Sequence, residues 1–165
     1  MNIAFNVKKF LEKKFKLHKI SSKNFAKESN ISYNTVCCIL NSKRNNTKFD
    51  TIIKIASYFY SPIDEILNRT NYINNNEYYN VNYVLENYNQ EIHNFLCLNI
   101  EKHSLNPYTL SCDLGFHNSV IQQFITDTTA TRTLTTPVII AVADYFKISI
   151  DEMINRISSE NSINN

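Results

Sequence analysis

Residues 21–44, with the sequence SSKNFAKESNISYNTVCCILNSKR, carry the side chains whose types and spacing best match a chemical task. The second half of this segment holds amide and hydroxyl side chains with few charges, and it ends on Lys43 and Arg44. An amide side chain can make paired hydrogen bonds with adenine in the major groove, while hydroxyl and methyl groups contact other bases. Two short helices joined by a tight turn, with a basic exit, are typical of a helix-turn-helix. The segment therefore predicts recognition of duplex DNA.

The turn between these two helices needs one residue in the left-handed backbone conformation, which Gly and then Asn adopt at the least cost. Asn30 stands at that position. The only glycine of the chain, Gly115, stands at the matching position of a second segment with the same pattern. This agreement supports a helix-turn-helix in both places.

Other residue sets do not form a catalytic or metal site. The cysteines include no CxxC pair, and the histidines are not spaced to complete a zinc site. We interpret the adjacent Cys37 and Cys38 as structural thiols, because neighbours on a helix point in different directions. The doublets Asp64–Glu65 and Asp151–Glu152 favour a capping and helix-dipole role at the start of a short helix. We therefore expect no enzyme, no metal and no cofactor.

The chain contains a tandem repeat. Residues 58–69, YFYSPIDEILNR, share seven identities in twelve positions with residues 145–156, YFKISIDEMINR, at an offset of 87. Further upstream the offset is 85, and the two-residue difference falls after Leu40 and Ile125, where a loop would absorb it. The sequence thus predicts two related units of about 70 residues.

Hydrophobic periodicity predicts five helices in each unit. In the first unit an amphipathic helix comes first, carrying Val7, Phe10, Leu11 and Phe15 on one face. The next three helices are expected to begin at caps provided by Ser21 or Ser22, by Ser32 and by Asp50, and the fifth covers residues 62–67. The helices of the second unit are expected over residues 84–100, 107–114, 118–125, 137–146 and 149–154.

These elements predict an all-α protein with four segments. They are a basic DNA-binding domain over residues 1–70, an Asn- and Tyr-rich linker over 71–83, a second domain over 84–156 and a flexible tail over 157–165.

The two halves of the chain carry opposite charges. Residues 1–70 hold 13 Lys and Arg against 5 Asp and Glu, a net charge of +8, whereas residues 71–165 hold 4 against 10, a net charge of −6. A basic half favours a polyanionic partner. No apolar run reaches the roughly 18 residues that span a bilayer, and the N-terminus lacks a signal-peptide core. We expect a cytoplasmic protein with no membrane partner.

Both units resemble the lambda-repressor-like, Xre-type helix-turn-helix regulators, through to the closing sequences IDEILNR and IDEMINR. The resemblance covers residues 3–69 well and residues 84–156 more loosely, because DTTATRTLTTP replaces the usual short basic connection. Members of this family are five-helix domains that bind operator DNA, commonly as dimers, and act as repressors, regulators or antitoxins. The resemblance implies two tandem five-helix domains joined by a polar linker, with double-stranded DNA as a partner and a homodimer as the form that binds.

The resemblance also implies roles for particular residues. Bases would be contacted by Tyr33, Asn34, Thr35 and Cys38. Phosphates would be contacted by Ser22, Lys23, Asn41, Lys43, Arg44 and Asn45. Ser22 stands where the family commonly has Gln, and Cys38 where it often has a longer polar or basic residue.

The second unit would be a weaker DNA site, because an acidic surface repels phosphates. The matching side chains there are Asn118, Ser119, Gln123 and Arg132. This unit would pack against the first unit or against another copy as a dimerisation module, or it would bring a weakly held half-site to the DNA, and charge repulsion favours the first role. The sequence predicts a sequence-specific regulator, most simply a repressor, with the helix over residues 32–41 in the major groove. The alternative is an antitoxin-like or other interaction module whose acidic second unit binds a protein partner.

Overall fold

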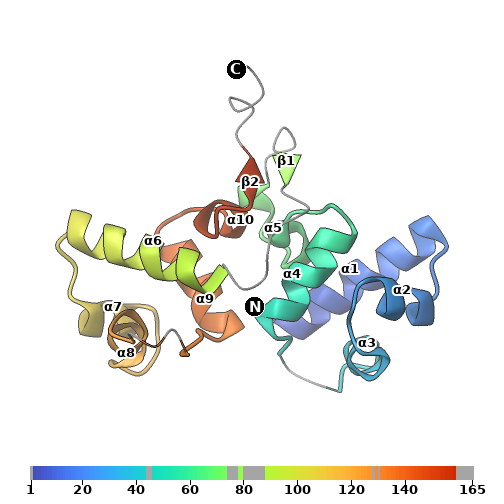
Figure 1. Cartoon of the computed structure of the whole chain (residues 1–165), viewed down its shortest axis with the longest axis horizontal. Helices are drawn as coiled ribbons and strands as arrows, with labels where there is room; N and C mark the ends of the chain where they lie inside the picture. Colours follow the sequence, from blue (N-terminus) through green and yellow to red (C-terminus); the bar gives the residue numbers. More distant parts are fainter. Residues whose placement is uncertain are drawn as a thin grey trace. The chain divides into compact units, whose positions relative to one another are not determined.

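The computed structural model describes residues 2–43, 46–73, 78–79, 88–127, 129 and 131–158, and it shows an all-α protein, as the sequence predicts. The described residues form two compact units, one with helices α1–α5 and one with α6–α10 (Figure 1). None of the helices in these ranges has the length and apolar character needed to cross a bilayer.

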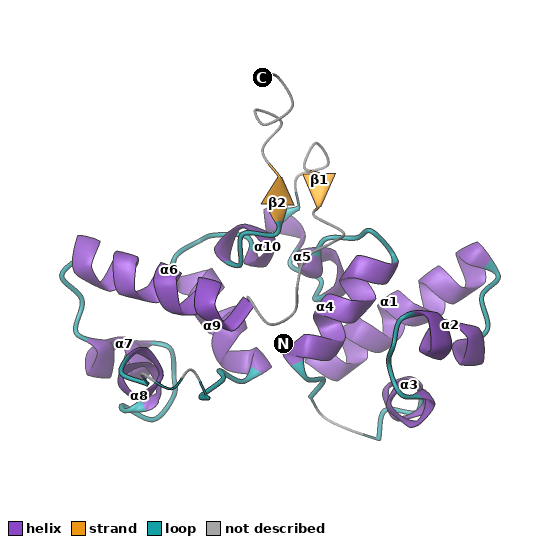
Figure 2. Ribbon diagram, viewed as in Figure 1, coloured by secondary structure: helices purple, strands orange, loops and turns teal. Residues whose placement is uncertain are grey.

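The first unit, unit 1, has a helical core. Its α-helices are α1 (Ile3–His18), α2 (Ser22–Glu28), α3 (Tyr33–Leu40), α4 (Phe49–Tyr58) and α5 (Ile63–Ile66), followed by the 3-10 helix η1 (Thr70–Tyr72). The predicted apolar face of α1 is buried at Val7, Phe10 and Leu11. The rings of Phe25 from α2 and Phe59 from the end of α4 stack with centroids 5.4 Å apart. These contacts hold α2 against the body of the unit, and α3 lies beside it (Figure 2).

The second unit, unit 2, repeats this order. Its helices are α6 (Tyr88–Lys102), α7 (Pro107–Asp113), α8 (Val120–Ile125), α9 (Thr136–Tyr145) and α10 (Ile150–Met153). Phe95 and Phe146 pack edge to face with centroids 5.3 Å apart. As α2 does with α3, α7 packs against α8.

Two short strands belong to unit 1. The strand β1 (Tyr78–Tyr79) pairs antiparallel with β2 (Ile157–Ser158), with Tyr78 opposite Ser158. These strands fall inside the segments that the sequence predicts as linker and tail. The remaining predicted linker residues 74–77 and 80–83, and tail residues 159–165, lie outside the described residues.

Left-handed residues recur where matching helices of the two units end. The pairs are Lys19 and Ser104 with φ of 53° and 50°, Asn30 and Gly115 with 53° and 81°, Tyr60 and Lys147 with 50° and 54°, and Asn68 and Asn155 with 59° and 54°. The first two pairs have the 85-residue offset of the sequence, and the last two have the 87-residue offset. The two units therefore share their turn geometry as well as their order of helices.

One capping prediction was wrong, and a second was correct only in part. Helix α4 begins at Phe49 with Lys48 as its N-cap, so Asp50 lies inside the first turn and does not cap it. The Phe49 ring is buried, and this burial favours its inclusion in the helix. Asp64 and Glu65 do lie in the first turn of α5, as the predicted helix-dipole role requires, but Pro62 is the N-cap, and the buried Asp64 carboxylate pairs with Arg69.

The same buried ion pair occurs in unit 2. Asp151 accepts a hydrogen bond from Arg156 Nη1 at 2.5 Å, and both side chains are almost fully buried. In each unit the Arg backbone N–H also donates to the carbonyl of the same Asp, at 2.8 Å. In each unit the buried Asp therefore links the last helix to the Arg that follows it, through both the side chain and the backbone.

Candidate nucleic-acid interface

The turn between α2 and α3 has the geometry that the sequence predicts. Asn30 is left-handed, and the next residue, Ile31, donates its backbone N–H to the Ala26 carbonyl at 3.1 Å. This bond closes a Schellman motif at the end of α2. Lys54 Nζ on α4 donates to the Asn30 carbonyl at 3.1 Å, so α4 also holds the turn. Gly115 occupies the same motif in unit 2, where the Phe116 N–H donates to the Ser111 carbonyl at 3.0 Å.

Serine caps the predicted helices on both sides of this turn. Ser21 Oγ accepts from the Asn24 N–H at 3.2 Å at the start of α2, and Ser32 Oγ accepts from the Thr35 N–H at 3.2 Å at the start of α3. Both are caps that the sequence predicts. The two caps fix the residues at which α2 and α3 begin.

Helix α3 is buried on one side and exposed on the other. Val36 and Ile39 are buried, whereas Tyr33 and Asn34 are exposed. Cys38 is half-buried, and its Sγ lies 3.9 Å from Asn34 Oδ1, one helical turn away. The structure therefore brings Asn34 and Cys38 together on the outer side of α3.

Thr35 lies less freely than the other predicted base-contact residues. Its side chain is half-buried, and its Oγ1 lies 2.7 Å from Ser32 Oγ, in a hydrogen bond in which either hydroxyl can donate. Part of its hydrogen-bonding capacity is therefore used in the cap of α3.

The predicted phosphate-contact residues lie at the two ends of the helix-turn-helix. Lys23 in the first turn of α2 is exposed, as are Asn41 and Lys43 after α3, while Ser22 is half-buried. Arg44 and Asn45 lie outside the described residues. Lys23 and Lys43 make no ion pair among the residues that the structure describes, so their charges are available to a polyanion.

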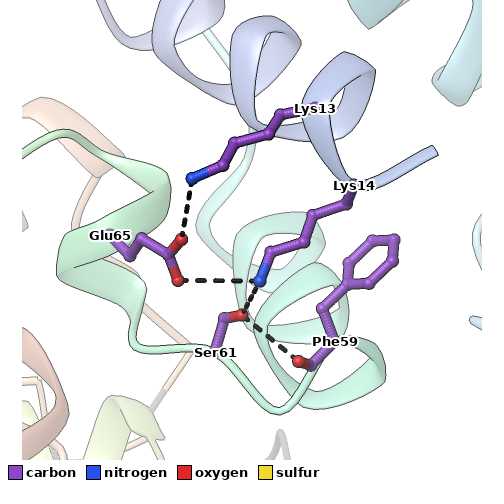
Figure 3. Close-up of polar contacts among 5 residues, drawn as sticks. All are labelled: Lys13, Lys14, Phe59, Ser61 and Glu65. Carbon is purple, nitrogen blue, oxygen red and sulfur yellow. Dashed lines mark hydrogen bonds and ion pairs between the residues drawn. The ribbon is translucent and has the colours of Figure 1, made fainter. Parts of the chain in front are cut away.

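Other lysines of unit 1 are engaged inside the unit. Lys13 Nζ and Lys14 Nζ lie 3.9 Å and 3.8 Å from the Glu65 carboxylate (Figure 3). Lys14 Nζ also donates to Ser61 Oγ at 2.9 Å. These contacts join α1 to α5 and the loop before it. Part of the positive charge of residues 1–70 is therefore paired within the unit and is not available to a partner.

A small depression beside α3 adds residues that the sequence predictions missed. It is lined by Thr35, Ile39, Asn46, Thr47, Lys48 and Thr51. Lys48 is exposed and flanks the first residue of α4. The polar run Asn46-Thr47-Lys48 directly before a helix was the signal available in the sequence, but placing the cap at Asp50 hid it.

In unit 2, helix α8 begins two residues later than predicted, at Val120. Asn118 therefore precedes the helix and is exposed, and Ser119 is the N-cap without a side-chain cap bond. Ser119 Oγ instead lies 2.9 Å from Nδ1 of the neighbouring His117. The hydroxyl predicted to face DNA thus has a partner in its own loop.

Gln123 and Arg132 of unit 2 pair with each other. Arg132 Nη1 donates to Gln123 Oε1 at 3.0 Å, and both side chains are exposed. The structure therefore brings together two residues of the predicted weaker site, in a bond that occupies part of the guanidinium.

The loop after α8 is organised around a carboxylate. Hydrogen bonds from Thr129, from the Arg132 N–H and from Thr131 lower the pKa of Asp127 to about 2. The carboxylate is therefore ionised at neutral pH.

The four cysteines are free thiols. Burial raises the pKa of Cys97, whose Sγ lies 3.7 Å from His93 Nδ1. Within the described ranges, no group of three or more His, Cys, Asp or Glu residues is arranged to hold a metal ion.

Comparisons with known proteins give the class of the chain. Over 72 aligned residues, which include 42% of this chain and 78% of the other protein, the chain is 44% identical to an uncharacterized HTH-type transcriptional regulator of Rickettsia prowazekii (strain Madrid E). The identity is also 44% over 72 residues with an uncharacterized HTH-type transcriptional regulator of Rickettsia conorii (strain ATCC VR-613 / Malish 7), of which 66% is covered. The chain therefore belongs to the HTH-type transcriptional regulators. No protein-family model matches it, and no solved structure does.

Proposed function

We propose that this chain is a sequence-specific DNA-binding repressor of the lambda-repressor-like, Xre type, and that α3 of unit 1 enters the major groove. The observation that carries the proposal is the outer side of α3, where Asn34 is exposed beside Cys38 on a helix fixed by a Schellman turn and a serine cap. An exposed Asn near the start of such a helix has the donor and acceptor that adenine requires.

The cations around α3 support the same proposal. Lys23 and Lys43 are exposed at opposite ends of the helix-turn-helix, where side chains of this kind contact the phosphates on either side of a bound helix. Such contacts fix the position of the helix, and the exposed side chains of α3 then determine the preferred sequence. A bound regulator of this size covers promoter DNA and excludes polymerase, which is the simplest route to repression.

The proposed domains follow from the same comparison of the two units. Residues 1–70 form the DNA-binding domain, and residues 84–156 form a second domain with the same order of helices and matching left-handed residues. The second domain serves in self-association, because its acidic surface repels phosphates. An interaction with a different protein through this acidic domain is the alternative role.

The proposal is tested by fluorescence anisotropy of the full chain with duplexes from its own promoter region, at several salt concentrations. Replacing Lys43 and Arg44 by Ala should weaken binding to all sequences, and should reduce the slope of log K against log[salt] by about 2. Asn34→Ala should instead reduce discrimination at one base pair by about 1–3 kcal/mol. Asn118→Ala is the control, because Asn118 is an exposed Asn beside Ser119, the residue of unit 2 that matches Asn34, and it should leave that discrimination unchanged.

The absence of salt-sensitive DNA binding at low ionic strength would contradict the proposal. Equal effects of Asn34→Ala and Asn118→Ala on discrimination would contradict the assignment of base contacts to α3.

A further inference from the structure

The residue that follows the third helix by two positions differs between the units. It is Ser42 after α3 in unit 1 and Asp127 after α8 in unit 2, at the 85-residue offset of the repeat. In unit 1 the segment from Asn41 to Lys48, NSKRNNTK, has no carboxylate and three cations. In unit 2 the corresponding loop, TDTTATRTLTT, has one cation, Arg132, and the carboxylate of Asp127.

The Asp127 carboxylate accepts hydrogen bonds from donors of its own loop. Oδ1 accepts from the Thr129 N–H at 3.0 Å and from Thr129 Oγ1 at 2.5 Å. Oδ2 accepts from Thr131 Oγ1 at 3.3 Å and from the Arg132 N–H at 2.6 Å. Two backbone amides and two hydroxyls thus converge on one anion.

Donors arranged in this way bind phosphate oxygens by the same chemistry as carboxylate oxygens, because both are anions that accept several hydrogen bonds. In unit 2 these donors are already satisfied. A phosphate that approached them would meet a full negative charge rather than free N–H and O–H groups.

The Arg132 side chain and backbone are held as well. Its guanidinium donates to Gln123 Oε1, and its carbonyl accepts from Asn89 Nδ2 at 2.8 Å. The one cation of the loop is thereby directed toward the helix that matches α3.

We propose that Asp127 is a specificity-determining residue that keeps unit 2 off DNA, by filling with its own carboxylate the loop that would otherwise meet a phosphate. This inference rests on the proposed function, since it takes unit 1 as the DNA-binding domain. It assigns one DNA-contacting helix to each copy of the chain, although each copy has two helix-turn-helix geometries.

The test uses the full chain with Lys43 and Arg44 replaced by Ala, so that binding through unit 1 does not mask unit 2. In this background, Asp127→Ser gives unit 2 the residue that unit 1 has at the matching position. Asp113→Ser is the matched control, because Asp113 is an exposed acid on α7 of the same unit and its loss changes the net charge equally. Anisotropy with a mixed-sequence duplex of about 20 base pairs at low salt measures the dissociation constants.

We expect Asp127→Ser to tighten binding about two- to fivefold relative to Asp113→Ser, and to add about 1 to the salt slope. Asp127→Asn removes the charge and keeps an oxygen that accepts from Thr129, so it should change binding in the same direction even if the serine variant loosens the loop. The inference is overturned if neither Asp127 variant exceeds the Asp113 control.

The two proposals fail in different ways. If the unsubstituted chain does not bind DNA, the proposed function is wrong whatever the Asp127 variants do. If the unsubstituted chain binds through Lys43 and Arg44 but the Asp127 and Asp113 variants behave alike, the proposed function stands and the role of Asp127 is wrong.

Discussion

Helices α3 of unit 1 and α8 of unit 2 occupy matching positions, but the loops that follow them differ in backbone conformation and in charge. Ser42 is left-handed, and the next N–H, that of Lys43, donates to the Cys38 carbonyl at 3.0 Å, so α3 ends in a Schellman motif. Asp127 at the matching position is not among the left-handed residues of the described chain, and its carboxylate organises the loop instead. One exit presents an exposed lysine, and the other presents an internally bonded anion.

The cores of the two units differ far less. Each has a buried pair between an Asp in the first turn of its last helix and an Arg that follows this helix, and each has a left-handed residue between its second and third helices. These features depend on burial and backbone conformation, for which few residue types are suitable. Surface loops are free of that constraint. The comparison teaches that two units with the same helical core can present loops of opposite charge to a polyanion.

The largest effect is expected from breaking the shared ion pair. Arg69→Ala and Arg156→Ala each leave a buried aspartate without this partner, and each should lower the free energy of unfolding of its unit by about 3–5 kcal/mol. Urea unfolding followed by circular dichroism measures the loss, and amide hydrogen exchange assigns it to one unit. Arg132→Ala, which removes an exposed arginine, is the control and should cost about 0.5 kcal/mol or less.

Similar losses of unfolding free energy for Arg69→Ala and Arg156→Ala would support the equivalence of the two helical cores. A loss for either variant as small as that of the Arg132 control would contradict it. Replacing both Asp64 and Arg69 by apolar residues of similar volume should recover much of the loss, because the buried charge is then removed with its partner.

A smaller effect is expected at the turn between the second and third helices. An added Cβ at Gly115 meets nothing within 4 Å, so Gly115→Ala should cost only the backbone strain of a left-handed alanine, about 1 kcal/mol. Asn30→Ala should cost a similar amount, whereas Asn30→Gly should be tolerated within a few tenths of a kcal/mol. The midpoint of urea unfolding at an unchanged slope measures each change. If Asn30→Ala lowers the free energy of unfolding and Gly115→Ala leaves it unchanged, the two turns are not equivalent.

The features that follow from local sequence could be predicted, and those that depend on tertiary contacts could not. Periodicity located the helices, and the requirement for positive φ identified Asn30 and Gly115, because both signals lie within a few residues. The partner of Asp64 was missed because the same residue is also suited to a helix start. The internal bonding of Lys14 and Asp127 depends on how helices and loops fold back on one another, which composition does not reveal.

The smallest effect concerns a bond in unit 1 between α4 and α2. Tyr58 Oη donates to Glu28 Oε2 at 2.5 Å, and this hydrogen bond is the main cause that raises the pKa of Tyr58 from 10.0 to about 12. Because the folded state holds the phenolic proton more tightly, the bond stabilises the protein fully below pH 10. This contribution is lost as the pH rises through about 12. Tyr58→Phe should therefore cost about 0.5–1 kcal/mol at pH 8, and the difference from the unsubstituted chain should shrink above pH 10.

Urea unfolding at pH 8 and at pH 11 measures this difference. Tyr145→Phe is the matched control, because Tyr145 occupies the equivalent place at the end of α9 and makes no hydrogen bond to a carboxylate among the described residues. At pH 8, Tyr58→Phe should lower the free energy of unfolding more than Tyr145→Phe does. Only Tyr58→Phe removes a hydroxyl that donates to a carboxylate, that of Glu28. A difference between the two variants that is the same at pH 8 and at pH 11 would show that the Tyr58 bond to Glu28 does not form.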